Sequence, residues 1–311
     1  MHEHIARAFY YFEIHLLYAS MVGLAAWVLT SIRGGSATTK YWIWVATSLN
    51  FVLPVGAVAD KLWASHLSWA TPLDVVGGFA NTISRGWIAA ILSGVWLFGA
   101  TLMVTRLSLR IHAERRDAQA AADQSAHESK RGFFAHGVPV RFTENRQAPA
   151  VDGVLHPYIS LPNGIERLLS EHELEAVLIH ELTHARRRDN LIRLIYEVTF
   201  CMLWFHPLVW IAGSRLALYR ELSCDESVIR SARGRDLISA LAKLANPEKG
   251  FLLQATASSF LGHRLVRLAS AQPQPTRRAA SGLLIATFSA ILLGGIFGTV
   301  AHTACCFVAK K

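Results

Sequence analysis

The residues His180-Glu181-Leu182-Thr183-His184 form an H-E-x-x-H motif, and the rest of the chain can be interpreted outward from it. Residues four apart lie on one face of a helix, so His180 and His184 are expected to point the same way. Two imidazoles one turn apart can bind one Zn²⁺, and Glu181 is then placed to act as a base toward water. A five-residue match can also arise by chance, so its context decides between a metal site and a coincidence.

The residues before the motif predict the helix that a metal site would need. Neither glycine nor proline occurs from Glu166 to Asn190, and an apolar run leads up to Ile179. Ser170 and Glu173 have the S-x-x-E spacing of a capping box, so the helix should begin just after Ser170. The motif therefore lies on a predicted helix, which favours the metal site.

A catalytic zinc ion usually has a third protein ligand and one open position. The candidate is Glu221, in the stretch Tyr219-Arg220-Glu221-Leu222-Ser223-Cys224-Asp225-Glu226. Asp225 lies four residues further along a predicted helix, where it can accept a hydrogen bond from a ligand histidine. A helix cap or a surface charge is the alternative for Asp225, and Glu226 is expected to be a solvated charge.

These residues give the chain its resemblance to a known family. The patterns are His180-Glu181-x-x-His184-x-x-Arg187-Arg188-Asp189-Asn190, Trp204-Phe205-His206-Pro207-Leu208-x-Trp210 and Glu221-x-x-Cys224-Asp225. Together they resemble the BlaR/MecR type of membrane zinc metallopeptidase, a family of antirepressor signal transducers. The resemblance implies that His180, His184 and Glu221 bind zinc and that Glu181 is the catalytic base.

The composition is typical of a polytopic membrane protein with a sizeable soluble portion. Apolar residues make up 52% of the 311 residues, charged residues make up 17%, and the mean hydropathy is +0.30. The formal charge of +9 is compatible with nucleic-acid binding. Basic cytoplasmic loops are the commoner cause in membrane proteins, so no direct nucleic-acid partner is expected. The four cysteines form no C-x-x-C pair, which indicates neither a disulfide framework nor a cysteine zinc site.

Four apolar runs predict transmembrane helices and divide the chain into three parts. Three of them, at about 14–30, 41–59 and 86–104, belong to a membrane region over residues 1–106. Residues 107–278 are expected to form a cytoplasmic peptidase domain, and residues 279–311 a fourth span at about 282–301 with a short external tail. The expected fold class is mainly α, with a gluzincin-like α+β zinc peptidase domain inserted between the third and fourth spans.

The distribution of basic residues predicts the orientation of these spans. Arg33 and Lys40 lie in the first loop without an acidic partner, and Arg106 and Arg110 follow the third span, whereas the second loop is balanced. The positive-inside rule then places both termini outside and the H-E-x-x-H segment in the cytoplasm. By resemblance, the membrane is the bacterial cytoplasmic membrane.

A fifth apolar segment, residues 196–218, lies between the second histidine of the motif and Glu221. A full crossing would separate these two ligands, so this segment is expected to be a membrane-associated helical hairpin at about 191–222, broken at Pro207. His206 would lie at its tip. A metal ligand, a transition-state donor and, more commonly, an ordinary turn residue are the alternatives for His206.

Other segments carry weaker expectations. Short strands are predicted at Val138–Phe142 and Pro157–Leu161, and Val154–Leu161 is assigned to an edge strand that could pair with an extended substrate. Arg264–Leu268 is expected to form a membrane-surface stripe. The basic residues at the end of the motif helix are expected to compensate the helix dipole at the surface.

The leading functional interpretation is a membrane-anchored zinc endopeptidase that acts on a cytoplasmic protein, with the lipid bilayer and that protein as partners. The resemblance implies a signalling role through cleavage of a BlaI/MecI-like repressor or of the chain itself. Relatives that sense β-lactams carry a large extracellular penicillin-binding domain after the last span, whereas this sequence ends at Lys311. The expected input is another protein or a membrane signal, unless the chain is the protease module alone.

Three alternatives stay open at this point. A quality-control or CAAX-type membrane peptidase would share the motif but matches less well around residues 204–207 and Cys224-Asp225. A non-catalytic membrane scaffold that retained the motif would be recognised by its zinc content. A homodimer is compatible with the sequence.

Overall fold

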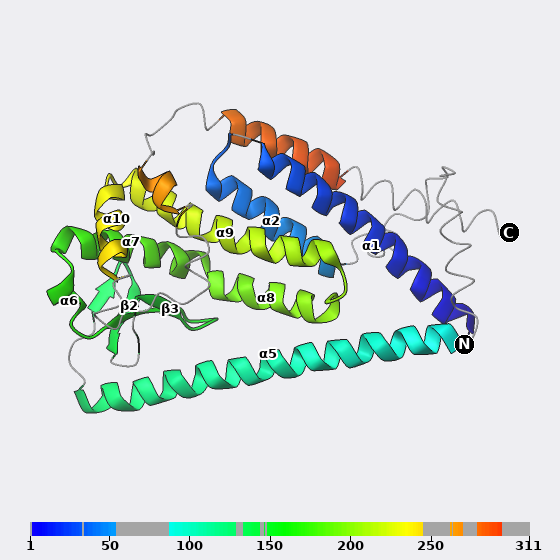
Figure 1. The fold of residues 1–311 in the computed structure, drawn as a ribbon, viewed down its shortest axis with the longest axis horizontal. Coiled ribbons are helices and arrows are strands. Elements are labelled where there is room, and N and C mark those ends of the chain that lie inside the picture. Colours follow the sequence, from blue (N-terminus) through cyan, green and yellow to red (C-terminus); the bar gives the residue numbers. More distant parts are fainter. Residues whose placement is uncertain are drawn as a thin grey trace.

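The computed structural model describes residues 2–32, 34–53, 87–128, 133–143, 146, 148–244, 262, 264–269 and 279–293. The fold is mainly helical, as predicted, with one small sheet (Figure 1). The helices are α1 (His2–Ser31), α2 (Ala37–Val52), α5 (Trp87–Glu128), α6 (Ile165–Leu168), α7 (Glu171–Arg187), α8 (Asp189–Met202), α9 (Pro207–Arg230) and α10 (Gly234–Leu244). Further helical segments are residues 264–269 and Ala279–Leu293. The strands are β1 (Phe133–Ala135), β2 (Val138–Thr143), β3 (Ala150–Asp152) and β4 (Tyr158–Pro162).

Buried apolar side chains form two large clusters, which α9 connects. The helical cluster joins α1, α2, most of α9 and the helix Ala279–Leu293, with Tyr41 and Trp44 among its largest buried members. The sheet cluster joins the sheet, α7 and α10, and takes in Val228 near the end of α9. Residues 221–225 of α9 therefore lie where the two clusters meet.

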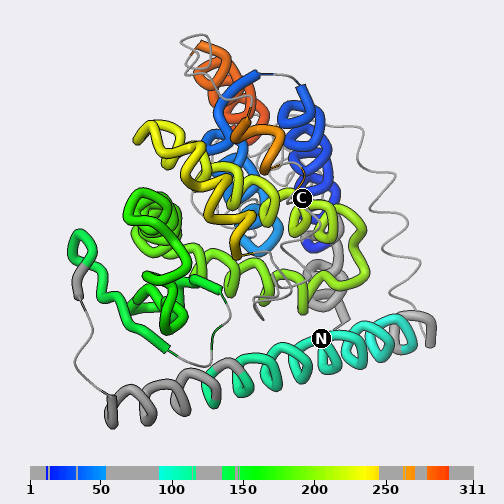
Figure 2. Tube along the Cα trace, turned by 60° about the vertical axis from the view of Figure 1, so that its left-hand side comes forward, coloured from blue at the N-terminus to red at the C-terminus, as the bar shows by residue number. Residues whose placement is uncertain are grey.

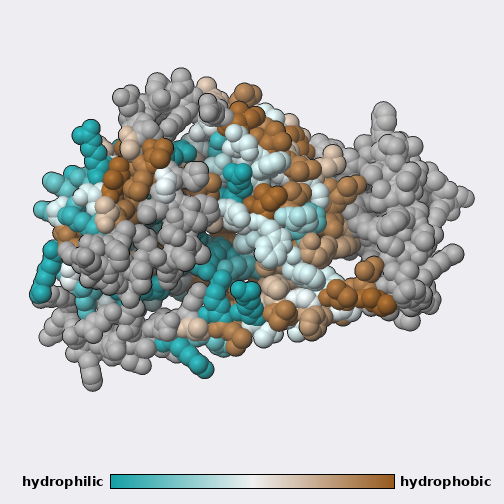
Figure 3. Space-filling view, viewed as in Figure 1, coloured by the Kyte–Doolittle hydropathy of each residue, from teal (hydrophilic) through white to brown (hydrophobic). Residues whose placement is uncertain are grey.

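Helix α5 runs along one side of the molecule (Figures 1 and 2). Its segment Ile91–Ala113 is long and apolar enough to cross a membrane, and almost all of this segment is exposed. Two shorter apolar helices, His15–Ser31 and Ala279–Leu293, also occur among the described residues. Figure 3 shows hydrophilic side chains gathered toward the end of the molecule that holds the sheet, and apolar ones along the helices away from it. This separation is typical of a protein with a membrane part and a water-exposed part.

The predicted spans correspond only partly to described helices. The third is the first half of α5, which continues without interruption to Glu128. Residues 54–59 of the second, residue 86 of the third and residues 294–301 of the fourth lie outside the described residues. The described part of the second span is α2, whose Tyr41 and Trp44 are buried in the helical cluster. Along these residues α2 packs against α9, α8 and α1.

Helix α7, which carries the motif, begins as predicted. The Ser170 hydroxyl accepts a hydrogen bond from the Glu173 backbone N–H, and the Glu173 carboxylate accepts one from the Ser170 backbone N–H at 2.7 Å. Ser239 and Lys243 of α10 also donate to Glu173. Burial alone raises the pKa of Glu173, but these donors outweigh burial and lower the pKa to about 2. The start of the metal helix is thereby tied to α10.

The sheet has the strand order β1-β2-β4-β3, in which β2 and β4 are parallel and the outer pairs antiparallel. The two predicted strands correspond to β2 and β4. The assignment of Val154–Leu161 to the edge is wrong, because β4 pairs with a neighbour on both sides. The edge strand on that side is β3, and α7 packs beside it.

The apolar segment 196–218 breaks at the predicted proline. Helix α8 ends at Met202, and Pro207 is the first residue of α9, where its missing N–H costs no helical hydrogen bond. His206 precedes the proline, and its Nε2 lies 3.0 Å from Ser20 Oγ of α1. Of the alternatives for His206, the structure supports an ordinary turn residue.

The turn between α8 and α9 lies against α5. A Cβ atom on Gly99 would come within 2.2 Å of the Trp204 side chain, so only glycine allows this close approach. Trp96 of α5 also donates its indole N–H to the Met202 carbonyl at 2.9 Å. The tip of the hairpin is therefore packed on the segment of α5 that is long and apolar enough to cross a membrane.

Candidate metal centre

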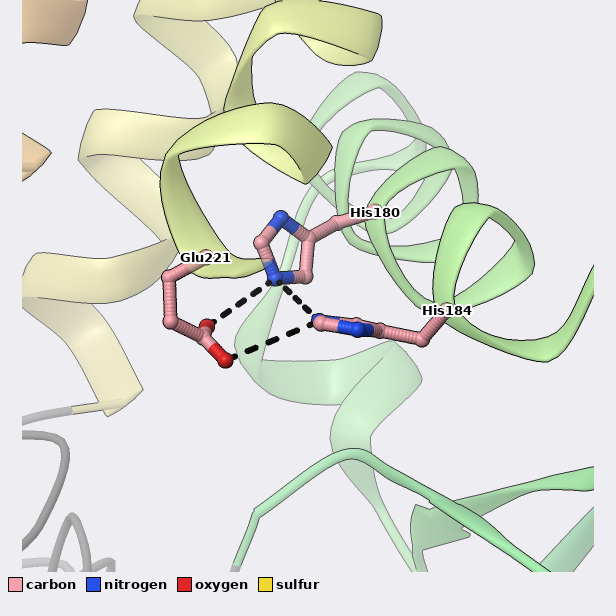
Figure 4. A group of neighbouring side chains, drawn as sticks. All are labelled: His180, His184 and Glu221. Carbon is pink, nitrogen blue, oxygen red and sulfur yellow. Dashed lines mark hydrogen bonds and ion pairs between the residues drawn. The ribbon is translucent and has the colours of Figure 1, made fainter. Parts of the chain in front are cut away.

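Three side chains from two helices converge on one point (Figure 4). His180 and His184 come from successive turns of α7, and Glu221 comes from α9. The two Nε2 atoms are 3.2 Å apart. Glu221 Oε2 lies 3.6 Å from His180 Nε2, and Glu221 Oε1 lies 3.8 Å from His184 Nε2. The structure thus brings together all three ligands that were expected from the sequence.

These separations suit a tetrahedral zinc ion. Zn²⁺ binds imidazole nitrogen and carboxylate oxygen at about 2.0–2.2 Å, so ligand atoms at the tetrahedral angle are about 3.4 Å apart. The observed separations of 3.2, 3.6 and 3.8 Å bracket that value. Both imidazoles also present Nε2 to the common point, which leaves each Nδ1 for a partner behind the ring. The residues present therefore fit a zinc ion.

Asp225 lies behind His180. Its Oδ1 is 3.1 Å from His180 Nδ1, close enough for an ion pair although the contact is not aligned as a hydrogen bond. Asp225 is completely buried. Arg264 donates to both of its oxygens, from Nε at 2.9 Å and from Nη2 at 2.8 Å. The third guanidinium nitrogen of Arg264 lies 3.5 Å from Glu221 Oε2, so one arginine contacts two carboxylates of the centre.

Asp189 lies behind His184. Its Oδ2 is 2.6 Å from His184 Nδ1. Arg187 donates to both Asp189 oxygens, and Tyr41 of α2 donates its hydroxyl to Oδ1 at 2.7 Å. A carboxylate behind a ligand imidazole fixes the orientation of the ring and raises its basicity. Both histidines of the motif have such a partner.

The buried charges of the centre compensate one another. Burial lowers the pKa of His180, but the carboxylates of Asp225 and Glu221 outweigh burial and raise the pKa to about 9. Burial favours the neutral acid of Glu221, yet His180, His184 and neighbouring arginines hold its pKa well below the ordinary value. The pKa of Asp225 is likewise lowered, because His180 and Arg264 outweigh burial. The carboxylates are therefore ionised, as metal binding requires.

Glu181 follows His180 on α7 and is half-buried. Burial lowers the pKa of Arg264, and the contact with Asp225 raises it again, with further contributions from the charges of Glu221 and Glu181.

A second possible ligand group, His184, Asp189 and Cys224, overlaps the first. Arg187 occupies it, with Nη2 at 3.2 Å from Cys224 Sγ and 2.5 Å from Asp189 Oδ2. This guanidinium contacts Asp189 and Cys224 directly, whereas Arg264 lies 3.5 Å from both His180 Nε2 and Glu221 Oε2, so a metal cation is repelled more strongly from the second group. Burial also raises the pKa of the Cys224 thiol well above its ordinary value, which disfavours the thiolate that would bind metal. The group of His180, His184 and Glu221 is therefore the candidate metal centre.

The BlaR1 peptidase M56 family matches residues 12–267. The match covers most of the chain and includes both helices that supply the ligands. The chain belongs to the BlaR1 peptidase M56 family. Its fold, mainly helical with an exposed apolar span, agrees with membership of this family of membrane peptidases.

Similar proteins include one named as a regulatory protein and one named as a methicillin resistance protein. Regulatory protein BlaR1 of Bacillus licheniformis is 24% identical over 306 residues, which cover 89% of this chain and 49% of that protein. The methicillin resistance mecR1 protein of Staphylococcus aureus is 26% identical over 103 residues, which cover 33% of this chain and 18% of that protein. The M56 chain thus spans about half the length of its Bacillus relative and less of the staphylococcal one.

Three contributors to this M56 centre were missed by sequence reasoning. Asp189 lies inside the matched motif but was given no role, and its adjacency to Arg187 is the signal that could have indicated one. Tyr41 and Arg264 come from distant parts of the chain, and no local pattern links them to α7. The expectation of a membrane-surface stripe at Arg264–Leu268 is wrong, since Arg264 is only 5% exposed and is paired with Asp225.

Two other charged side chains, Glu226 and Arg187, are also largely shielded from water, against expectation. Glu226 is not a solvated charge but is 5% exposed, and it accepts hydrogen bonds from Arg267 and from the backbone of α2. Arg187 does not lie at the surface, because Asp189 and Ser223 hold it inside. Asp225 is neither a surface charge nor a helix cap. Each of these side chains can lie away from water because an oppositely charged side chain stabilises it there.

The centre predicts an order of zinc affinities. Glu221→Ala removes a ligand and should abolish stable zinc binding, whereas Asp225→Ala removes a supporting carboxylate and should weaken the affinity by about 10–100-fold. Competition with a chromophoric chelator measures both. A larger loss for Asp225→Ala than for Glu221→Ala would mean that the two roles must be exchanged. Glu175→Ala, an exposed change on α7, is the control.

Proposed function

We propose that this M56 chain is a membrane-anchored zinc endopeptidase acting on a cytoplasmic protein. The observation that carries the proposal is the convergence of His180, His184 and Glu221 from two helices, with a buried carboxylate behind each imidazole. Zinc bound by these residues would polarise a scissile carbonyl and make water more acidic.

Glu181 is the residue proposed to move the proton. It would take a proton from water and pass it to the leaving amine, the role of a general base and then a general acid. Its support is its place between the two ligand histidines on α7, together with its absence from the group of ligand atoms.

The edge strand β3 is proposed to receive the extended substrate. Strand addition gives a peptide main-chain hydrogen bonds along a free sheet edge. Asn190, at the start of α8, donates its side-chain N–H groups to the carbonyls of Val151 and Gly153 at 2.9 and 3.1 Å. This contact holds β3 against the corner where α7 ends, so a peptide along β3 would be fixed relative to the metal helix.

For the biological substrate we propose a transcriptional repressor of the BlaI/MecI kind or the chain itself. Membership of the BlaR1 family and likeness to a protein named regulatory protein BlaR1 support a signalling role over a quality-control one. Zinc would be the cofactor. The repressor, and not this chain, would bind nucleic acid.

A single conservative change tests the catalytic role. Glu181→Gln should leave zinc bound and abolish cleavage, because it removes the base without removing a ligand. Glu171→Gln, an exposed change in the first turn of the same helix, should leave both unchanged. The readouts are zinc content and cleavage of a repressor-derived protein in a defined assay. Near-normal cleavage by Glu181→Gln would rule out the proposed mechanism.

We also propose that the α8–α9 hairpin enters the membrane from the cytoplasmic side without crossing it. His184 and Glu221 must share one metal, so the segment between them has to return to the same face. Its exposed apolar side chains, Val198, Met202, Phe205 and Trp210, would contact lipid. The chain would then cross the membrane four times, with both termini outside.

Cysteine labelling tests this arrangement. In a chain whose native cysteines are replaced by alanine, His172→Cys before the motif and Arg230→Cys after Glu221 are both exposed. Both should react with a membrane-impermeant reagent from the cytoplasmic side only, whereas Phe205→Cys at the hairpin tip should resist it from either side. Labelling of the first two positions from opposite faces would overturn the hairpin and Glu221 as a ligand together.

A further inference from the structure

Helix α2 supplies no metal ligand, yet it contacts the metal centre through Tyr41. The Tyr41 side chain is 1% exposed and donates its hydroxyl to Asp189 Oδ1 at 2.7 Å. The opposite oxygen of Asp189 is the one that holds His184 Nδ1. The Arg187 guanidinium, which also donates to Asp189, lies 4.0 Å over the Tyr41 ring. A single residue of α2 therefore touches both groups that orient His184.

Helix α2 is also held to the helix that supplies the third ligand. Glu226 of α9 accepts hydrogen bonds from the backbone N–H groups of Ala37 and Thr38 at 2.7 and 3.2 Å, and from the Thr38 hydroxyl at 3.1 Å. These residues are the first turn of α2, where N–H groups have no partner within the helix and a carboxylate is favoured. Glu226 directly follows Asp225, which supports His180.

The two contacts make α2 a bridge between the ligand-bearing helices. Tyr41 is tied to the corner where α7 ends and α8 begins, and Glu226 ties the start of α2 to α9, one turn beyond Glu221. Between these points α2 packs along α9 and α8. The distance between the imidazole pair on α7 and the carboxylate on α9 therefore depends on where α2 lies.

We propose that α2 sets the geometry of the metal centre, with Tyr41 as a positioning residue for His184. The proposal rests on the zinc peptidase function and adds a route for its control. A signal that displaces α2 would withdraw the Tyr41 hydroxyl from Asp189 and loosen the carboxylate that orients the imidazole. Zinc affinity would change without any change in the ligands.

The test compares two buried tyrosines of the same helical cluster. Tyr41→Phe removes the hydroxyl that meets Asp189. Tyr219→Phe removes a hydroxyl that donates instead to the Thr30 carbonyl of α1 at 2.9 Å. Both residues are almost fully buried, at 1% and 6% exposure, so each variant keeps its ring and loses one buried hydroxyl.

The expected result is a selective loss of zinc affinity. In the full-length chain in detergent, Tyr41→Phe should weaken zinc binding by about tenfold or more, and Tyr219→Phe by less than about twofold. The midpoint temperature of thermal unfolding of the metal-free chain should fall for both variants, and by more for Tyr41→Phe, because its hydroxyl meets a carboxylate. Equal zinc affinities for the two variants would overturn the proposal.

A double-mutant cycle shows whether the effect passes through Asp189. In an Asp189→Asn background, Tyr41→Phe should cost less than about threefold in zinc affinity, because the carboxylate that it positions is gone. The same loss in both backgrounds would place the action of Tyr41 elsewhere and contradict the proposed route. If Tyr41→Phe lowers stability more than its control does, this cycle still shows whether Tyr41 acts through Asp189.

Failure of this proposal can be told from failure of the proposed function. If the unmodified chain binds zinc and requires Glu181 for cleavage while Tyr41→Phe behaves like Tyr219→Phe, only the role of α2 is wrong. A chain that takes up no zinc at all would overturn both.

Discussion

The structure depends on the pairing of charged side chains that are buried around the candidate metal centre. Asp189, Asp225 and Arg264 are each at most 5% exposed. Removing a single charge from water costs several kcal/mol unless an opposite charge and hydrogen bonds replace the solvent. Each of these groups has such a partner, as in the two-pronged contacts of Arg187 with Asp189 and of Arg264 with Asp225. The two carboxylates that back the ligand imidazoles are held in turn by these arginines.

This constraint explains why elements far apart in sequence meet around α9. The helix passes from the helical cluster to the sheet cluster, and its acidic residues lie at the junction. Glu221 faces the imidazoles, Asp225 lies behind His180 and meets Arg264, and Glu226 meets the start of α2. One stretch of α9 thus links the ligands to the segment 264–269 and to α2. Moving any of these elements would displace the ligand side chains, because separating a buried charge from its partner is costly.

Local patterns were sufficient to predict helix α7 and the shared orientation of its two motif histidines. The capping box at Ser170 and the four-residue spacing of the histidines are both local signals, and the structure contains the helix that they predict. The break at Pro207 also followed from one residue. Glu221 was a candidate from its place four residues before Asp225 on a predicted helix, and the family resemblance added the role of third ligand.

The partners of the ligands could not be predicted in this way. Tyr41 precedes Asp189 by more than a hundred residues, and nothing near either residue indicates the other. Arg264 lies in a short apolar-basic stretch whose pattern suits a membrane surface equally well. Strand β3 has only three residues, too few for an alternating pattern, so the edge was assigned to β4. In each case a tertiary contact, not a local preference, decides the position.

We propose that His180, His184 and Glu221 together bind one zinc ion. X-ray absorption spectroscopy of the zinc-loaded chain, combined with its metal content, is the sharpest test of this assignment. One zinc per chain is expected, with two imidazole ligands, oxygen as the remaining donor, and no sulfur. A sulfur ligand at about 2.3 Å would contradict it by placing the metal at Cys224 in the overlapping group, and so would a chain without stoichiometric zinc.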